Sequence, residues 1–179
     1  MKEIALHLLD ILENSAKGGA TGVTLDLERR GSVFHMRIVD NGPGLPPAVR
    51  LDPTDPFSTT RRERPVGLGL ALLRMAAEHA GGGMQVRSPE AGGVEVEASF
   101  NLQHIDAQPL GGLDDVLATA LASWPALNLI VRVGADHQVV LNTWELKTEI
   151  NGIDFSNPKV HKSISTSLRE ALSELSLPE

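Results

Sequence analysis

The sequence of 179 residues contains no cysteine. This absence excludes disulfide bonds, iron–sulfur clusters held by thiolates and catalysis by a thiol. Any nucleophile in this protein must therefore be a serine or threonine hydroxyl, a lysine amine, a histidine imidazole or a carboxylate.

Long apolar runs are absent as well. No stretch approaches the roughly 20 apolar residues that a helix needs to cross a bilayer. The first apolar stretch is interrupted by Asp10 and Glu13, which is not typical of a secretory leader. We therefore expect a cytoplasmic protein that does not associate with a membrane.

Basic clusters are also scarce. The formal net charge is −7, and the local basic run consists of Arg61, Arg62 and Arg64 around Glu63. Because binding to nucleic-acid backbones requires clustered basic residues, we expect no nucleic-acid partner. The hydrophobic content of 41% is enough to bury a core in one domain or two small ones.

The first hundred residues alternate between helical and strand patterns. Such an order predicts an α+β fold, a two-layer α/β sandwich in which one mixed sheet carries helices on one face. The predicted elements are, in chain order, a helix over 2–17, strands over 23–27 and 33–39, a proline-rich loop over 42–66, a helix over 67–80 and a hairpin of strands over 84–87 and 94–102.

The pattern restarts after a polar stretch near residue 105. Asn142 with Glu145, and Asn157 before Pro158, are typical helix-start pairs. The predicted elements are a helix over 113–122, a hairpin of strands over 127–133 and 138–141, a short helix and a last amphipathic helix. We therefore expect two units, an α/β sandwich over 1–105 and a small α+β unit over 106–179, and we interpret the second as an interaction or dimerisation module.

Asp10 and Asn14 lie one turn apart on the polar face of the first predicted helix. Mg²⁺ prefers oxygen ligands, so the amide oxygen of Asn14 is a candidate ligand and Asp10 could orient a water or hydroxyl beside the ion. A solvated helix face would show the same residues, so this segment alone leaves both interpretations open.

Asp40 directly follows a hydrophobic strand and precedes a turn that contains Gly42 and Gly44. Glycine lets the backbone approach a ligand closely. A carboxylate accepts a hydrogen bond from the exocyclic amine of adenine but not from O6 of guanine, so the segment favours adenine. The alternative is an ordinary Asp-Asn-Gly turn.

Gly67 and Gly69 stand at the start of the next predicted helix. Backbone N–H groups at a helix start form a favourable anion site, whereas a glycine-relaxed helix start without ligand is the alternative. No Gly-Lys-Ser/Thr follows, so this is not a Walker phosphate-binding loop.

Four segments together resemble the boxes of the GHKL superfamily, which includes DNA gyrase, the heat-shock chaperone of ninety kilodaltons, histidine kinases and the MutL mismatch-repair protein. Residues 10–20 resemble the N-box, 39–45 the G1 box, 56–61 the F-box of histidine kinases and 66–72 the G2 box. The resemblance covers about residues 1–102 and implies the Bergerat ATP-binding fold of the histidine-kinase type. The chain departs from the kinase pattern at Pro65, where the G2 box usually has a glycine.

This resemblance implies that the protein binds ATP and Mg²⁺. It assigns Asn14 to the metal, Lys17 to phosphate and Asp40 to the adenine amine, while Asp10 takes the place where ATP-hydrolysing members carry a longer glutamate base. The remaining residues that it assigns to the nucleotide are Gly42 and Gly44 in the adenine pocket, Thr59, Thr60 and Arg61 in the lid, and Gly67, Leu68, Gly69 and Leu70 at the G2 helix.

None of the six histidines is followed by the acidic residue of a phosphoacceptor box. Two functions stay open. In the first, a histidine-kinase-type protein without its own phosphoacceptor domain transfers a phosphoryl group to a histidine or serine of a separate protein. In the second, ATP drives a conformational switch, or a weak ATPase, that regulates a partner without kinase activity. A homodimer through the C-terminal unit is compatible with both.

Overall fold

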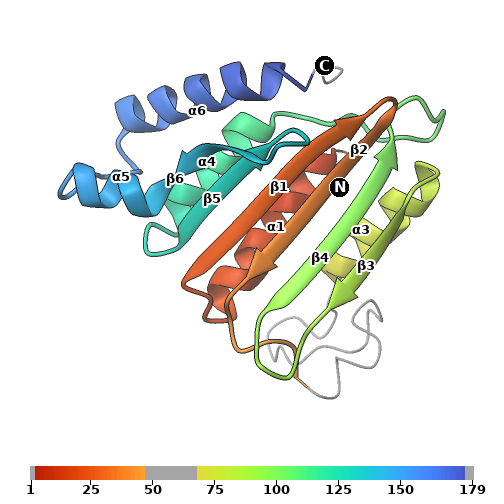
Figure 1. Ribbon diagram of the computed structural model, residues 1–179, viewed down its shortest axis with the longest axis horizontal. Helices are drawn as coiled ribbons and strands as arrows, with labels where there is room; N and C mark the ends of the chain where they lie inside the picture. Colours follow the sequence, from red (N-terminus) through yellow and green to blue (C-terminus); the bar gives the residue numbers. More distant parts are fainter. Residues whose placement is uncertain (1–2, 47–67, 176–179) are drawn as a thin grey trace.

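The computed structural model describes residues 3–46 and 68–175. Its described strands form a single mixed sheet in the order β3-β4-β2-β1-β5-β6 (Figure 1). The strands are β1 (Gly22–Arg30), β2 (Val33–Asp40), β3 (Gly83–Arg87), β4 (Val94–Asn101), β5 (Asn128–Val133) and β6 (Gln138–Asn142). The helices are α1 (Ile4–Lys17), α3 (Leu68–His79), α4 (Leu113–Ser123), α5 (Thr143–Glu149) and α6 (Pro158–Ser173).

Helices α1, α3 and α4 cover one face of the sheet, and α6 packs against α4 (Figure 1). The fold is therefore α+β with helices on one face, which confirms the predicted two-layer sandwich. Alternation along the strands explains this arrangement, because Leu25 and Leu27 of β1 are buried toward the helices. Asp26, between them, lies on the other face of the sheet with Arg37 of β2.

The C-terminal strands extend the same sheet. β5 pairs with β1 in parallel, from Gly22 opposite Asn128 to Leu27 opposite Val133, and β6 follows at the edge. A single buried cluster includes Leu12 from α1 and Leu168 from α6. Strands from both of the proposed units, 1–105 and 106–179, thus share one sheet and one core.

Two predicted helix starts are confirmed. The Asn142 side chain accepts hydrogen bonds from the backbone of Trp144 and Glu145 at the start of α5. The Asn157 side chain accepts one from the backbone of Lys159, with Pro158 in the first turn of α6.

Several predicted features lie outside the described residues. Most of the proline-rich loop predicted over 42–66 is among them, together with Thr59, Thr60, Arg61 and Gly67. Within the two described ranges, no helix combines the length and the apolar character needed to cross a bilayer.

Candidate functional site

A cavity of about 400 Å³ lies between α1, the end of β2 and the start of α3. Its volume falls in the range of small-molecule sites. Asn14, Ser15 and Lys17 contribute polar groups from α1, and Asp40 does so from β2. Apolar side chains that line the cavity include those of Ile11, Ile38, Leu70, Val94 and Val96. The cavity therefore combines an apolar wall with a small set of polar groups.

The carboxylate of Asp40 is held in place by three donors. The hydroxyl of Ser15 donates to Oδ2 at 2.8 Å. The backbone N–H groups of Gly42 and Val94 donate to Oδ1 at 2.9 and 3.1 Å. Each carboxylate oxygen has two lone pairs, so the hydrogen bonds made by the described residues leave one acceptor position on Oδ2 for a ligand.

Backbone bonds fix the turn after Asp40 against the hairpin that joins β3 and β4. The N–H of Gly93 donates to the carbonyl of Gly42 at 2.7 Å. Gly44 has a φ of 82°, and a Cβ on it would lie 2.9 Å from the hydroxyl oxygen of Ser88. Both its backbone and its surroundings therefore require glycine at position 44.

The start of α3 lies directly against the polar face of α1. A Cβ built on Gly69 would collide with Oδ2 of Asp10 and lie 3.3 Å from the amide nitrogen of Asn14. Only the absence of a side chain at Gly69 permits this approach. Asp10, Asn14 and the G2 helix, which the sequence predicted to act together, are therefore adjacent.

Lys17 lies at the rim of the cavity. Its ammonium pairs with Glu13 one turn earlier on α1, and its side chain is 58% exposed. Leu70 lines the cavity and Leu68 begins α3. Among the predicted site residues, those that line the cavity are Asn14, Lys17, Asp40, Gly42, Gly44 and Leu70. Gly69 lies against Asp10 and Asn14 and is not part of the cavity lining.

Sequence reasoning missed Ser15 and the backbone N–H of Val94. A signal for Ser15 was present, because it follows Leu8 and Leu12 at helical spacing and so falls on the apolar stripe of α1. A serine at such a position needs a buried partner, which is here the carboxylate of Asp40. No local pattern indicates Val94, since it pairs with Asp40 across the sheet.

The family model for histidine kinase-, DNA gyrase B-, and HSP90-like ATPases matches residues 2–104. A putative NtrY-like sensor histidine kinase from Rickettsia bellii is 26% identical over 106 residues, which cover 59% of this chain and 17% of the relative. The nitrogen regulation protein NtrY from Azorhizobium caulinodans is 30% identical over 116 residues, with coverages of 59% and 15%. This chain therefore matches less than a fifth of the length of these relatives.

Among solved structures, a mycobacterial sensor histidine kinase, MprB, superimposes with a TM-score of 0.43 and 25% identity over 52% of this chain and 66% of the other. The match to the family model rests on more than half of the sequence. Among the described residues, parts of the segments 10–20, 39–45 and 68–72 line the cavity that holds Asp40. The chain belongs to the family of histidine kinase-, DNA gyrase B- and HSP90-like ATPases, and its ATPase domain is of the histidine-kinase type.

Proposed function

We propose that this protein binds ATP with Mg²⁺ in the cavity beside α1 and transfers the γ-phosphoryl group to a separate protein in a signalling or regulatory role. The observation that carries the proposal is the Asp40 carboxylate, which three donors orient at an otherwise apolar wall. Family membership supports ATP as the nucleotide.

The adenine would occupy the apolar part of the cavity. Its amine would donate to the available acceptor position on Oδ2 of Asp40, and Ile38 and Val96 would contact the ring. Guanine presents a carbonyl oxygen at the same position, which would face the carboxylate without a proton between them. The site therefore favours ATP over GTP.

The phosphates would extend toward Asn14 and Lys17 at the rim. Mg²⁺ usually takes one or two protein oxygens and completes its shell with phosphates and water, so the amide oxygen of Asn14 suits it. Phosphoryl transfer depends mainly on positioning and charge stabilisation. The ammonium of Lys17 would leave its ion pair with Glu13 and pair with a phosphate instead. Asp10 would orient the attacking group.

A nucleotide-driven switch without transfer is the second candidate, and one observation favours it. The side-chain oxygen of Asn41 accepts hydrogen bonds from the N–H groups of Thr21 and Gly22, each at 2.9 Å. The carbonyl of Thr21 in turn accepts one from the N–H of Asn128, at the start of β5. The turn beside Asp40 is thus connected to the C-terminal strands by hydrogen bonds.

One experiment separates the two functions. The purified protein is incubated with γ-labelled ATP and Mg²⁺, alone and with cell extract, while bound nucleotide, released phosphate and labelled protein are followed together. Label on a second protein would support transfer to a separate protein. Tight binding with neither transfer nor release would support the switch, and absence of ATP binding would contradict both.

A further inference from the structure

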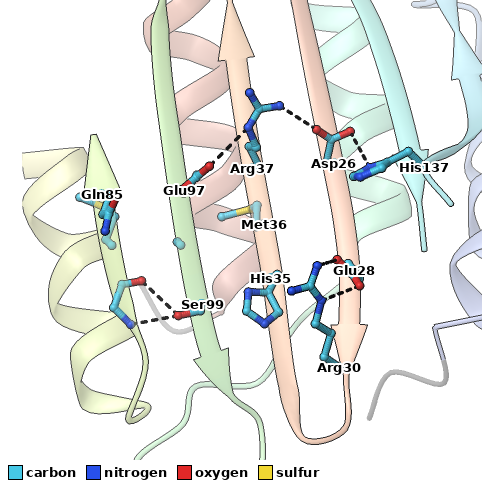
Figure 2. A pocket seen from close by; sticks show the side chains of 13 residues that line it. Asp26, Glu28, Arg30, His35, Met36, Arg37, Gln85, Glu97, Ser99 and His137 are labelled. Carbon is cyan, nitrogen blue, oxygen red and sulfur yellow. Dashed lines mark hydrogen bonds and ion pairs between the residues drawn. The ribbon is translucent and has the colours of Figure 1, made fainter. Parts of the chain in front are cut away.

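A second cavity, of about 490 Å³, lies on the open face of the sheet, opposite the face that α1, α3 and α4 cover (Figure 2). It shares no lining residue with the cavity that holds Asp40. Its volume also falls in the range of small-molecule sites. Met36, Met84 and Ala98 contribute apolar lining, and most of the remaining lining is charged or polar. The cavity can therefore accommodate an organic molecule and offers groups that would recognise its polar end.

The carboxylates of β1 at this cavity are already paired with guanidinium groups. Asp26 accepts hydrogen bonds from Arg132 at 2.5 and 3.0 Å and from Arg37 at 3.1 Å. Glu28 accepts two hydrogen bonds of 2.7 Å from Arg30. The negative charges of Asp26 and Glu28 are therefore compensated before a ligand arrives.

Glu97 of β4 is the remaining carboxylate among the described residues that line the cavity. Its Oε1 lies 3.5 Å from Nε of Arg37 and 3.6 Å from Nη1 of Arg87. Glu97 thus stands between two guanidinium groups. Each carboxylate in the described lining consequently has a cationic partner, and none of them presents an uncompensated negative charge.

The guanidinium groups lie nearer to the solvent than the carboxylates that they bind. The side chain of Arg30 is 68% exposed and that of its partner Glu28 is 13% exposed. The side chain of Arg37 is 41% exposed and that of Asp26 is 7% exposed. A molecule that approaches this face therefore meets positive charge first, which favours an anionic group.

Unused hydrogen-bond donors meet at one end of the cavity. Nε and Nη2 of Arg30 bind Glu28, whereas Nη1 has no partner among the described residues. His35 pairs directly with Glu28 across β1 and β2, so its ring lies beside the Arg30–Glu28 pair, as Figure 2 shows. Within residues 3–46 and 68–175, neither ring nitrogen of His35 makes a hydrogen bond.

We propose that this cavity binds a small organic molecule through an oxyanion, a carboxylate or a phosphate group, which Arg30 and His35 hold. A guanidinium donates paired hydrogen bonds to such groups, and the ring N–H of His35 adds a further donor. Glu28 fixes the guanidinium in advance, so less side-chain freedom is lost when the ligand binds. The organic part of the ligand lies over Met36 and Ala98. This site is separate from the nucleotide cavity and does not depend on the proposed function.

The test follows the ring-proton NMR signals of the histidines in the full-length protein without nucleotide. His35→Asn identifies the signal of His35 by its disappearance. The probes are sodium acetate and inorganic phosphate, each of which replaces sodium chloride at constant pH and ionic strength. We expect the His35 signal to shift until it saturates. The probe that saturates at the lower concentration distinguishes a carboxylate ligand from a phosphate ligand.

Arg30→Gln removes the proposed anion contact. Arg74→Gln is the matched control, because Arg74 is also an exposed arginine paired with a glutamate, Glu78, but belongs to α3 on the covered side of the sheet. We expect the half-saturation concentration to rise by about tenfold or more in Arg30→Gln, since hydrogen bonds to charged groups are lost. Arg74→Gln should bind as the wild type does, and the melting temperatures of all three proteins should agree.

Three results would overturn this inference. They are the absence of a saturable shift with either probe, a shift that all histidine signals share, and equal half-saturation concentrations in the wild type and in folded Arg30→Gln. Because no nucleotide is present, each of these results would leave ATP binding at Asp40 to its own test.

Discussion

Ser15 on α1 and Asp40 at the end of β2 are joined by a hydrogen bond of 2.8 Å from the hydroxyl to Oδ2. The bond connects the helix that carries Asn14 with the strand that carries the proposed adenine acceptor. Ser15 is 7% exposed, so water competes little for its hydroxyl. The orientation of the carboxylate therefore depends on the helix as well as on the turn.

Replacing Ser15 by alanine should weaken ATP binding. Hydrogen bonds to charged groups contribute about 1.5–3 kcal/mol, and part of that orients Asp40, so we expect a loss of about tenfold in affinity. Titration calorimetry measures this loss of affinity for ATP. Ser99→Ala is the control, because the Ser99 hydroxyl bonds Gly83 on the open face. Equal affinities in both variants would show that Ser15 does not position the carboxylate.

Replacing Gly69 by alanine should disrupt the junction between α3 and α1. The new Cβ would collide with Oδ2 of Asp10, so one of the two helices must move. We expect a lower melting temperature and weaker ATP binding. Thermal unfolding with and without nucleotide measures both effects. Gly83→Ala is the matched control, because within residues 3–46 and 68–175 no atom outside Gly83 and its two neighbours in the chain lies within 4 Å of its Cβ position. Unchanged behaviour of Gly69→Ala would contradict the close packing.

Periodicity predicted the elements that depend on local sequence. The apolar stripe through Leu8 and Leu12 forms α1, and the caps at Asn142 and Asn157 are in place. The parallel pairing of β5 with β1 was not predicted, because no local pattern identifies the partner of a strand a hundred residues away. The two ranges were therefore expected as separate units although they share a sheet.

The site was predictable to the extent that its groups follow one another in the chain. Asp10, Asn14 and Asp40 are marked by their positions at a helix face and at a strand end. The groups that hold Asp40 in orientation come from elsewhere. Val94 reaches it through pairing of β4 with β2, which depends on the tertiary fold.

Replacing Asn14 by alanine should remove the Mg²⁺ dependence of ATP binding. The amide oxygen of Asn14 is the proposed protein ligand, and without it the ion would keep only phosphates and water. The measurement compares ATP affinity with Mg²⁺ and with a chelator. If Asn14→Ala kept the wild-type Mg²⁺ dependence, Asn14 would not be a ligand of the metal and would be only a residue of helix α1.

We expect the free energy of unfolding to fall in mild acid because the side chain of His7 is buried. Burial lowers the pKa of His7 below its ordinary value of 6.5, and the hydrogen bond with Gln108 opposes this effect only in part. As the pH falls below about 6.5, the unfolded chain binds a proton that folded His7 does not. The free energy of unfolding then decreases by up to about 1.4 kcal/mol per pH unit until the lower folded pKa is reached.

Urea unfolding between pH 7.5 and about 5 measures this slope. His7→Leu should flatten it, since the buried titrating group is gone. His79→Gln is the control, because His79 is exposed at the end of α3. The same slope in His7→Leu and wild type would place the acid sensitivity at other groups.

The proposed contact between Asp40 and adenine is tested most directly by ATP binding to Asp40→Asn. The substitution preserves shape but removes charge, and it can present an amide N–H to the adenine amine. We predict that the variant keeps the wild-type melting temperature without nucleotide and loses ATP affinity by at least about a hundredfold, or about 2.7 kcal/mol. Wild-type affinity for ATP in a folded Asp40→Asn protein would contradict the site.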